Sequence, residues 1–416
     1  MKRIAIVGGG ASGLSAAIEA GRESEKRKIP VSVTVFERNP RVGKKLLLTG
    51  NGRCNLTNTH LWPGAYNTPR AMEVIRTFSE EDTRSFFAEL GVPTCCDEAG
   101  RVYPHSMQAG CVVNALRGEA ERIGIQLCTG TQIESVQYRR GFILSPLDRQ
   151  SFDSVIIAGG GCAYPATGSD GNGLQLLKSM GIPCVTPHPS LTGLKVPDRD
   201  FRSLKGVRAR ADVTLLIDGK CVKTEHGEVQ FADYGVSGIA VMQLSRLITR
   251  RLNGQKACRI ALSIDLAPDL DKLEVETFLG ALCRRSPQMQ AADLLAGIVP
   301  RRLGFYLLKR CGVPIGENIC GNIPHDKVIE LASQIKAFCL NIVAVRGFEQ
   351  AQVTAGGADL RAFDSNLMAR RIPGLFACGE VLDVDGMCGG YNLEWAFSSG
   401  RLCGKSAVDF LMEERP

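Results

Sequence analysis

The first forty residues constrain the fold most strongly, because they combine two apolar strands with a glycine-rich turn. Residues 3–7 form a short apolar segment that runs directly into Gly-Gly-Gly-Ala-Ser-Gly at residues 8–13. A second apolar segment, residues 31–36, ends at Glu37. This order of strand, glycine turn, helix and strand is typical of a dinucleotide-binding βαβ unit. The sequence therefore predicts an α/β fold with a parallel sheet.

Each glycine of the turn has a physical task in such a unit. Gly8 allows the tight turn, Gly10 lets the backbone approach a pyrophosphate, and Gly13 lets the helix pack close to the strand. The phosphates would lie at the N-terminus of a helix that begins near Ala11, where the backbone N–H groups and the helix dipole favour negative charge. Glu37 would accept hydrogen bonds from both hydroxyls of an adenosine ribose, and it would repel a 2′-phosphate.

Composition bounds the remaining possibilities. A chain of 416 residues predicts two or three domains. The net charge of +7 comes from short scattered basic runs, which does not predict a nucleic-acid track. The 16 cysteines form no C-x-x-C pair and the five histidines are dispersed, so we expect no metal site. The first strand begins at Ile4 without a signal segment, and no apolar run reaches the roughly 18 residues of a membrane span, so we expect a cytoplasmic protein with reduced thiols.

The pattern changes twice along the chain. Residues 154–158 form an apolar strand that opens onto three glycines, which predicts a buried strand of the same sheet. We expect helices at 70–90 and 109–123, strand-like alternation from 191 to 266, and helices from 267 to 326. A glycine-rich style returns near residue 352. The sequence therefore predicts a discontinuous nucleotide-binding domain with an inserted module.

FAD suits this arrangement because it is long and must be contacted at separated points of the sequence. A polar loop from Lys44 to Asn55 can wrap the phosphates and flavin, and Gly379-Glu380 can meet the ribityl chain. A helix near Tyr391 would direct its positive N-terminus at the flavin pyrimidine edge, which stabilises the reduced flavin. The predicted cofactor-binding residues are Gly8, Gly10, Ala11, Ser12, Gly13, Glu37, Arg38, Lys44, Lys45, Thr49, Gly50, Asn51, Arg53, Cys54, Asn55, Ile133, Ala158, Gly159, Gly160, Gly379, Glu380, Gly390, Tyr391, Asn392 and Leu393.

Three segments carry a family resemblance. Residues 49–58 (TGNGRCNLTN), 379–386 (GEVLDVDG) and 389–400 (GGYNLEWAFSSG) resemble the BaiN-like flavoproteins, and the likeness runs from Arg3 to the last helix. Members of that family are described as aminoacetone oxidases and as reductases of unsaturated bile-acid intermediates. The resemblance implies FAD and a glutathione-reductase-class FAD-binding domain with an inserted β-barrel and a small helical subdomain. The expected boundaries are 1–190 with 345–416 for the FAD-binding domain, 191–266 with 327–344 for the barrel, and 267–326 for the helical subdomain.

The chain also departs from the family pattern. Relatives usually have Ala-Thr-Gly-Gly where this chain has Ala158-Gly159-Gly160-Gly161. In the insert, the usual Thr-His is replaced by Ala232-Asp233. If the threonine and histidine contact substrate in relatives, this protein handles a different substrate.

Two further positions invite interpretation. Cys54 follows a flavin loop, but a disulfide reductase needs a second cysteine about five residues on, where this chain has Thr59. We therefore expect Cys54 to pack or to contact the flavin. We expect Tyr391 to contact the flavin and Trp395 to lie in the core, and the sequence assigns no catalytic acid.

The predicted function is that of an FAD-dependent oxidoreductase. The sequence favours a reductase of a small unsaturated or carbonyl substrate, driven by NADH or NADPH. Because only one full dinucleotide fingerprint is present, we expect the nicotinamide donor to bind transiently. Three alternatives stay open: an oxygen-using amine or aminoketone oxidase, a flavin-bearing RNA-binding protein, and a redox sensor. We expect a small-molecule partner and no membrane, the sequence disfavours a nucleic-acid partner, and the oligomeric state stays open.

Overall fold

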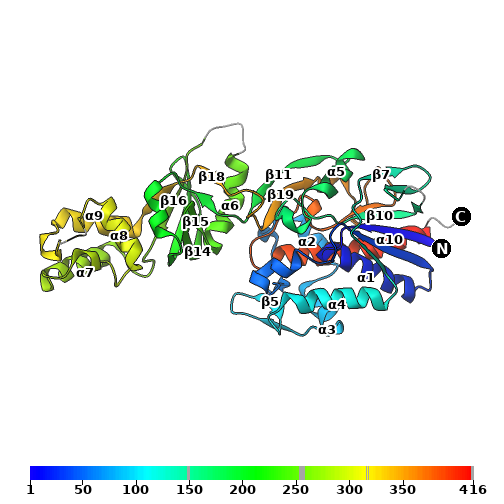
Figure 1. Cartoon of the computed structure of the whole chain (residues 1–416), viewed down its shortest axis with the longest axis horizontal. Coiled ribbons are helices and arrows are strands. Elements are labelled where there is room, and N and C mark those ends of the chain that lie inside the picture. The colour runs from blue at the N-terminus through cyan, green and yellow to red at the C-terminus, as the bar shows by residue number, and fades with distance from the viewer. Residues whose placement is uncertain (148–149, 253–257, 315, 317, 414–416) are drawn as a thin grey trace. The chain divides into compact units, whose positions relative to one another are not determined.

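The computed structural model describes the chain in two compact units (Figure 1). Unit 1 comprises Met1–Pro189 and Ala351–Pro416, and unit 2 comprises Ser190–Gln350. The description covers residues 1–147, 150–252, 258–314, 316 and 318–413. Each unit has its own hydrophobic core. No helix in these ranges is both long and apolar enough to cross a bilayer.

Unit 1 is built on a five-stranded parallel sheet with the order β20-β10-β1-β2-β6. Helix α1 connects β1 to β2, as the glycine turn predicts. All four residues of β10 are buried, which confirms the predicted interior strand. These elements are β1 (Lys2–Val7), α1 (Ala11–Lys26), β2 (Val31–Glu37), β6 (Gln126–Thr129), β10 (Ser154–Ile157) and β20 (Leu375–Ala377).

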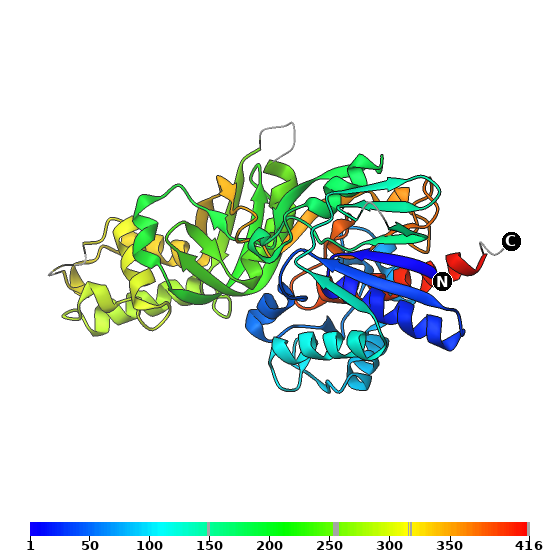
Figure 2. The ribbon, with the colours of Figure 1, turned by 45° about the vertical axis from the view of Figure 1, so that its right-hand side comes forward.

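Helix α10 (Tyr391–Glu413) lies along α1, as Figure 2 shows. A Cβ atom at Gly400 would lie 2.3 Å from the carbonyl oxygen of Ser12, and one at Gly404 would lie 2.2 Å from that of Ala16. Because real Cβ atoms do not approach so closely, the two helices can touch backbone to backbone only with glycine at both positions.

The predicted helix over 70–90 is two helices. Helix α2 (Arg70–Ile75) ends early, and Ser79 starts α3 (Glu80–Glu89). The Ser79 side chain accepts a hydrogen bond from the Asp82 N–H, and the Asp82 side chain accepts one from the Ser79 N–H. This capping box starts a new helix and overrides the continuous apolar pattern.

The remaining elements of unit 1 surround the parallel sheet. A three-stranded sheet has the order β3-β5-β4, another has the order β7-β8-β9, and β11 pairs with β19. Their bounds, with those of two further helices, are β3 (Thr57–Asn58), β4 (Thr94–Cys96), β5 (Arg101–Pro104), α4 (Ala109–Arg122), β7 (Ser135–Tyr138), β8 (Phe142–Ser145), β9 (Ser151–Phe152), α5 (Asn172–Ser179), β11 (Cys184–Ser190) and β19 (Val353–Ala358).

Unit 2 contains a seven-stranded antiparallel sheet with the order β17-β16-β13-β14-β15-β12-β18. Only two residues separate β17 from β18, so one extended segment pairs with both β16 and β12. The strands are β12 (Leu194–Lys195), β13 (Arg208–Ile217), β14 (Lys220–Ala232), β15 (Gly235–Ser237), β16 (Ile260–Asp265), β17 (Phe338–Asn341) and β18 (Ala344–Val345).

One segment of unit 2 differs from the expectation of strands throughout 191–266. Residues Ile239–Leu252 form helix α6. Val241, Leu244 and Ile248 are fully buried at a spacing of three and four residues, which is the helical period. The other helices of unit 2 are α7 (Lys272–Arg285), α8 (Arg301–Arg310) and α9 (His325–Lys336).

Candidate functional site

The glycine turn of unit 1 forms a cradle at the carboxyl end of β1. Gly8 has φ +112°, and a Cβ there would lie 2.4 Å from the Ala158 carbonyl oxygen. A Cβ at Gly13 would lie 1.9 Å from the Gly8 carbonyl oxygen. Gly10 differs, because, apart from its own neighbours in the chain, no heavy atom of the described residues lies within 4 Å of its Cβ position. The turn is therefore closed on its protein side and leaves open space above Gly10.

The N-terminus of α1 borders that open space. Gly10 is the N-cap residue, and no side chain of the described residues caps the helix there. The first N–H groups of the helix and its positive dipole end thus face the cradle. Both features suit a pyrophosphate.

Glu37 lies at the carboxyl end of β2, next to the turn, and is 8% exposed. Its Oε2 accepts a hydrogen bond of 2.8 Å from the Gly9 N–H. Its Oε1 accepts from the Asn39 N–H at 2.8 Å and from the Asn39 side chain at 2.6 Å. A carboxylate has about four acceptor positions, so the fixed side chain keeps capacity for a ribose hydroxyl. Asn39 was not among the predicted site residues, although an asparagine two positions after an acid is a typical local turn residue.

The glycines after β10 lie against the same turn. The Ala158 N–H donates to the Val7 carbonyl at 2.8 Å. Gly160 has φ +72°, and a Cβ at Gly159 would lie 3.0 Å from the Cα of Gly173. The structure therefore brings the 158–160 segment and the glycine turn of residues 8–13 together. We predicted cofactor-binding residues in both segments from the sequence. Ile133 is buried, and nearby Thr131 donates its N–H to the Glu37 carbonyl at 2.9 Å.

Several polar side chains that we predicted to bind the cofactor are held by the protein itself. Lys45 forms an ion pair of 2.7 Å with Glu380, and the other Glu380 oxygen accepts from the Thr354 N–H at 2.6 Å. Lys44 donates to the Ala166 carbonyl at 2.7 Å. Arg38 forms an ion pair with Asp170. These side chains fix the walls of the site.

The loop from Thr49 to Asn55 has left-handed backbone at Gly50, Asn51 and Cys54, with φ values of +56°, +55° and +59°. Cys54 is fully buried, and burial raises the pKa of its thiol to about 12. A protonated buried thiol is a poor nucleophile, which fits a packing role. The Arg53 guanidinium lies 5.1 Å from the centre of the Tyr103 ring.

The start of α10 is tied to that loop. Gly390 has φ +103°, and a Cβ there would lie 2.2 Å from the Thr57 carbonyl oxygen. In the orientation that satisfies its neighbours, the Asn55 amide accepts from the Gly390 N–H at 3.0 Å and donates to the Thr57 carbonyl at 3.0 Å. These contacts place the N-terminus of α10 beside the loop that we predicted to wrap the flavin.

The side chains at the start of α10 face the protein. Asn392 accepts from the Gly386 N–H at 2.7 Å and donates to the Gly386 carbonyl at 3.1 Å. Tyr391 is 7% exposed, and its hydroxyl donates to the His60 carbonyl at 3.1 Å. Leu393 is partly buried against the core. The polar groups of the Tyr391 and Asn392 side chains therefore bind His60 and Gly386 within the protein. The backbone at the start of the helix remains for a ligand.

Trp395 lies in the core, as predicted, with 1% exposure. Its indole N–H donates to the Gly379 carbonyl at 3.0 Å, and the Ser399 hydroxyl accepts from the Gly379 N–H at 3.0 Å. A Cβ at Gly379 would lie 2.4 Å from the Ser12 hydroxyl oxygen. The Gly379 segment, the first turn of α1 and α10 therefore meet at the carboxyl edge of the parallel sheet, where ligands bind in such folds.

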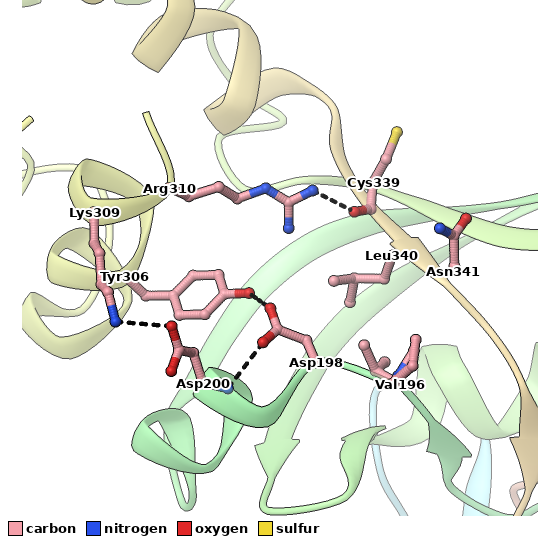
Figure 3. A pocket seen from close by; sticks show the side chains of 10 residues that line it. Val196, Asp198, Asp200, Tyr306, Lys309, Arg310, Cys339, Leu340 and Asn341 are labelled. Carbon is pink, nitrogen blue, oxygen red and sulfur yellow. Dashed lines mark hydrogen bonds and ion pairs between the residues drawn. The ribbon is translucent and has the colours of Figure 1, made fainter. Parts of the chain in front are cut away.

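Unit 2 contains a separate pocket of about 360 Å³ (Figure 3). The Tyr306 hydroxyl donates to Asp198, and burial together with Asp198 raises its pKa to about 12. Lys309 pairs with Asp200 at 2.8 Å, and Arg310 donates to the Cys339 carbonyl at 3.1 Å. No residue predicted to bind the cofactor lines this pocket.

Comparisons with known proteins cover nearly the whole chain. The family model described as HI0933-like protein Rossmann domain matches residues 2–406. The chain is 36% identical to the 3-dehydro-bile acid delta(4,6)-reductase of Clostridium scindens, over 98% of this chain and 100% of that protein. It is 28% identical to the ribosomal RNA dihydrouridine synthase of Haemophilus influenzae, over 96% of this chain and 97% of that protein.

A solved structure, the 3-ketosteroid delta1-dehydrogenase of Sterolibacterium denitrificans, has 11% identity and a TM-score of 0.49, with 98% of this chain and 100% of that chain covered. The family match and the first relative confirm the predicted family. The chain belongs to the HI0933-like family of Rossmann-domain proteins and is an FAD-dependent oxidoreductase.

Proposed function

We propose that the enzyme reduces a carbon–carbon double bond conjugated with a carbonyl group in a small organic substrate, with NADH or NADPH as the donor. The observation that carries this proposal is the chemistry common to the relatives' names. A 3-dehydro-bile acid delta(4,6)-reductase and a dihydrouridine synthase, as their names say, both reduce a carbon–carbon double bond that a nearby carbonyl group activates. The higher identity to the bile-acid enzyme favours a small molecule.

We also propose how unit 1 holds FAD. The open space above Gly10 and the N-terminus of α1 would receive the pyrophosphate, and Glu37 would hold the adenosine ribose. The N-terminus of α10, fixed by Asn55 and Gly390, would meet the pyrimidine edge. Bound FAD supplies hydride transfer, and the chain positions it and stabilises the negative charge of the reduced state. We propose that the remaining residues predicted from the sequence to bind the cofactor also contact FAD.

The finer domain division is part of the proposal too. The pairing of the segment 338–345 with both β16 and β12 supports a closed, barrel-like sheet in the insert. Helices α7, α8 and α9 would form its helical subdomain.

The test is an anaerobic titration of the FAD-loaded protein with NADH and with NADPH, followed by flavin absorbance. We expect one donor to bleach the flavin, and a 3-oxo-4,6-diene bile acid to restore the colour with formation of the saturated product. Bleaching by an amine alone, followed by peroxide release in air, would instead identify the oxidase alternative. A flavin that neither nucleotide reduces would contradict the proposed donor.

A second candidate is the same reaction on uridine in RNA. Two relatives are named ribosomal RNA dihydrouridine synthase, one of them from Escherichia coli with 27% identity over 97% of both chains. Residues 190–350 contain 23 Lys or Arg and 17 Asp or Glu, so unit 2 carries +6 of the net charge of +7. Such a charge asymmetry favours a polyanionic partner. Incubation of the reduced enzyme with unmodified ribosomal RNA, followed by mass spectrometry for dihydrouridine, decides between the two substrates.

A further inference from the structure

A buried carboxyl group lies in the first turn of α10. Glu394 is the fourth residue of the helix and is completely buried. Its Oε1 contacts the Ser398 hydroxyl at 2.9 Å and the Thr83 hydroxyl at 3.2 Å. The Oε2 atom of Glu394 and the Thr57 hydroxyl oxygen are both buried and have no hydrogen bond of good geometry within the described chain.

The hydrogen-bond donors around Glu394 indicate that the carboxyl group can hold a proton. The Ser398 hydroxyl oxygen lies 2.8 Å from the Phe78 carbonyl oxygen and 2.9 Å from Oε1 of Glu394. The carbonyl oxygen can only accept a hydrogen bond. A hydroxyl carries one hydrogen and two lone pairs. If the Ser398 hydrogen goes to Phe78, a proton on Glu394 completes the second hydrogen bond. An ionised carboxyl group would leave one of these two short contacts without a hydrogen.

The surroundings of Glu394 favour the neutral form. Burial raises its pKa from the usual 4.5 to about 7, and the hydroxyls of Thr57, Ser398 and Thr83 oppose that shift. Glu80 on α3 raises the pKa further and is itself paired with Arg84 at 3.3 Å. Arg401, farther along α10, pairs with Glu19 at 2.9 Å. The group therefore titrates in the physiological range.

Glu394 also lies close to the helix end that we propose for the flavin. It lies three positions after Tyr391, a rise of about 4.5 Å along the helix axis. Thr57, whose hydroxyl faces Glu394, places its carbonyl against Gly390. Negative charge at the pyrimidine edge would thus develop near the carboxyl group, in an interior where charges interact strongly.

We propose that Glu394 is a proton acceptor coupled to the redox state of bound FAD. When two electrons and one proton convert FAD to its anionic reduced form, the ionised Glu394 carboxylate takes up a second proton from solvent. Reoxidation releases that proton. The electrons come from the nicotinamide donor or, in a test, from dithionite. The inference rests on FAD binding at α10 and is independent of which substrate the enzyme reduces.

The test is the midpoint potential of the FAD-loaded protein as a function of pH, measured with dithionite and reference dyes. For the wild type, we expect one proton per two electrons below about pH 7 and two protons per two electrons in an interval above it. Glu394→Gln keeps the size and hydrogen bonds of the side chain but cannot titrate, so it should show one proton per two electrons throughout. An unchanged wild-type profile in Glu394→Gln would overturn the inference.

One control variant and one second measurement keep this result specific. Glu119, another buried carboxylate of unit 1, pairs with Arg122 and Arg22, and Arg122 holds its pKa below the usual range. Glu119→Gln should therefore keep the wild-type profile. If Glu394→Gln fails to hold FAD, infrared difference spectra of the wild type at pH 8 give a second measurement. We expect reduction to add the C=O band of a protonated carboxyl group, and its absence would contradict the proposal. Dithionite needs no substrate, so a wrong substrate assignment leaves this test intact.

Discussion

The two units bury different kinds of polar side chain. Unit 1 places six carboxyl groups in its interior, whereas the buried polar side chains in the described part of unit 2 are all hydroxyls. The buried acids are Glu19, Glu23, Glu37, Glu119, Asp385 and Glu394, and the buried hydroxyls are Ser190, Thr192, Ser245 and Thr249. Buried charges are costly unless they are paired or serve a ligand. Unit 1 therefore keeps ionisable acids in its interior, while the described part of unit 2 keeps its carboxyl groups outside and its core apolar.

The buried acid Glu394 gives the largest expected effect. Its pKa rises from 4.5 to about 7 on folding. Between pH 4.5 and about 7, the folded state therefore keeps a proton that the unfolded state has lost. The stability that this proton supplies is fully present below pH 4.5 and is lost as the pH rises through about 7. By linkage, the loss amounts to about 3 kcal/mol for the wild type relative to Glu394→Gln. Denaturant unfolding from pH 4.5 to 8 measures it, and parallel curves for the two proteins would contradict it.

The second prediction separates the cradle from the fold. A methyl group at Gly10 would meet no non-neighbouring atom of the described residues, so Gly10→Ala should fold but fill the space proposed for the pyrophosphate. We expect FAD to bind about 100-fold more weakly, equivalent to about 2.8 kcal/mol. Fluorescence titration with FAD measures this. Gly110 on α4 is equally open, and Gly110→Ala should keep the affinity and stabilise the protein by about 0.5–1 kcal/mol. Equal affinity in both variants would remove the cradle from the site.

The third prediction concerns unit 2. Tyr306→Phe removes the hydroxyl that donates to Asp198 in the pocket of Figure 3. We expect a loss of about 1 kcal/mol in the free energy of unfolding, because one hydrogen bond disappears beside an exposed acid. The affinity for FAD should not change, since every residue predicted to bind the cofactor belongs to unit 1. A weaker FAD complex would show that the two units are not independent in this respect.

The smallest effect is expected at the surface of unit 2. Asp233 pairs with Lys205 at 3.1 Å, and both side chains are exposed. Solvent and salt screen such pairs, so Asp233→Asn should leave the melting temperature unchanged at physiological ionic strength. A fall of several degrees would mean that unit 2 uses its surface charge for stability after all.

The sequence predicts local features of this protein well, because their causes are local. The βαβ unit, the close glycines and the buried Trp395 follow from periodicity and from residues within a few positions of one another. The discontinuity of unit 1 follows from glycine-rich segments at both ends of the chain. The break between α2 and α3 was visible in Ser79 and Asp82, but the apolar pattern across it predicted one helix.

Other parts of the site depend on residues that are far apart in the sequence. Lys45 meets Glu380, and Asn55 meets Gly390, across more than 330 positions. No spacing rule predicts such pairs. We therefore predicted from the sequence that these residues bind the cofactor, but not that they also form contacts within the protein. Glu394 was missed for the same reason: its partners Thr57 and Thr83 come from other elements. The one available signal was an acid inside the apolar stretch of residues 391–397.

The glycine contact between α10 and α1 has a consequence for how the protein is made. The carbonyl oxygens of Ser12 and Ala16 are covered by Gly400 and Gly404, which a ribosome adds almost 400 residues later. During synthesis the N-terminal strand and helix must therefore wait, with part of one face uncovered, while all of unit 2 is produced. Unit 2 has a core of its own and can fold in that interval. The site that we propose for FAD is then among the last parts of the nascent chain to be completed.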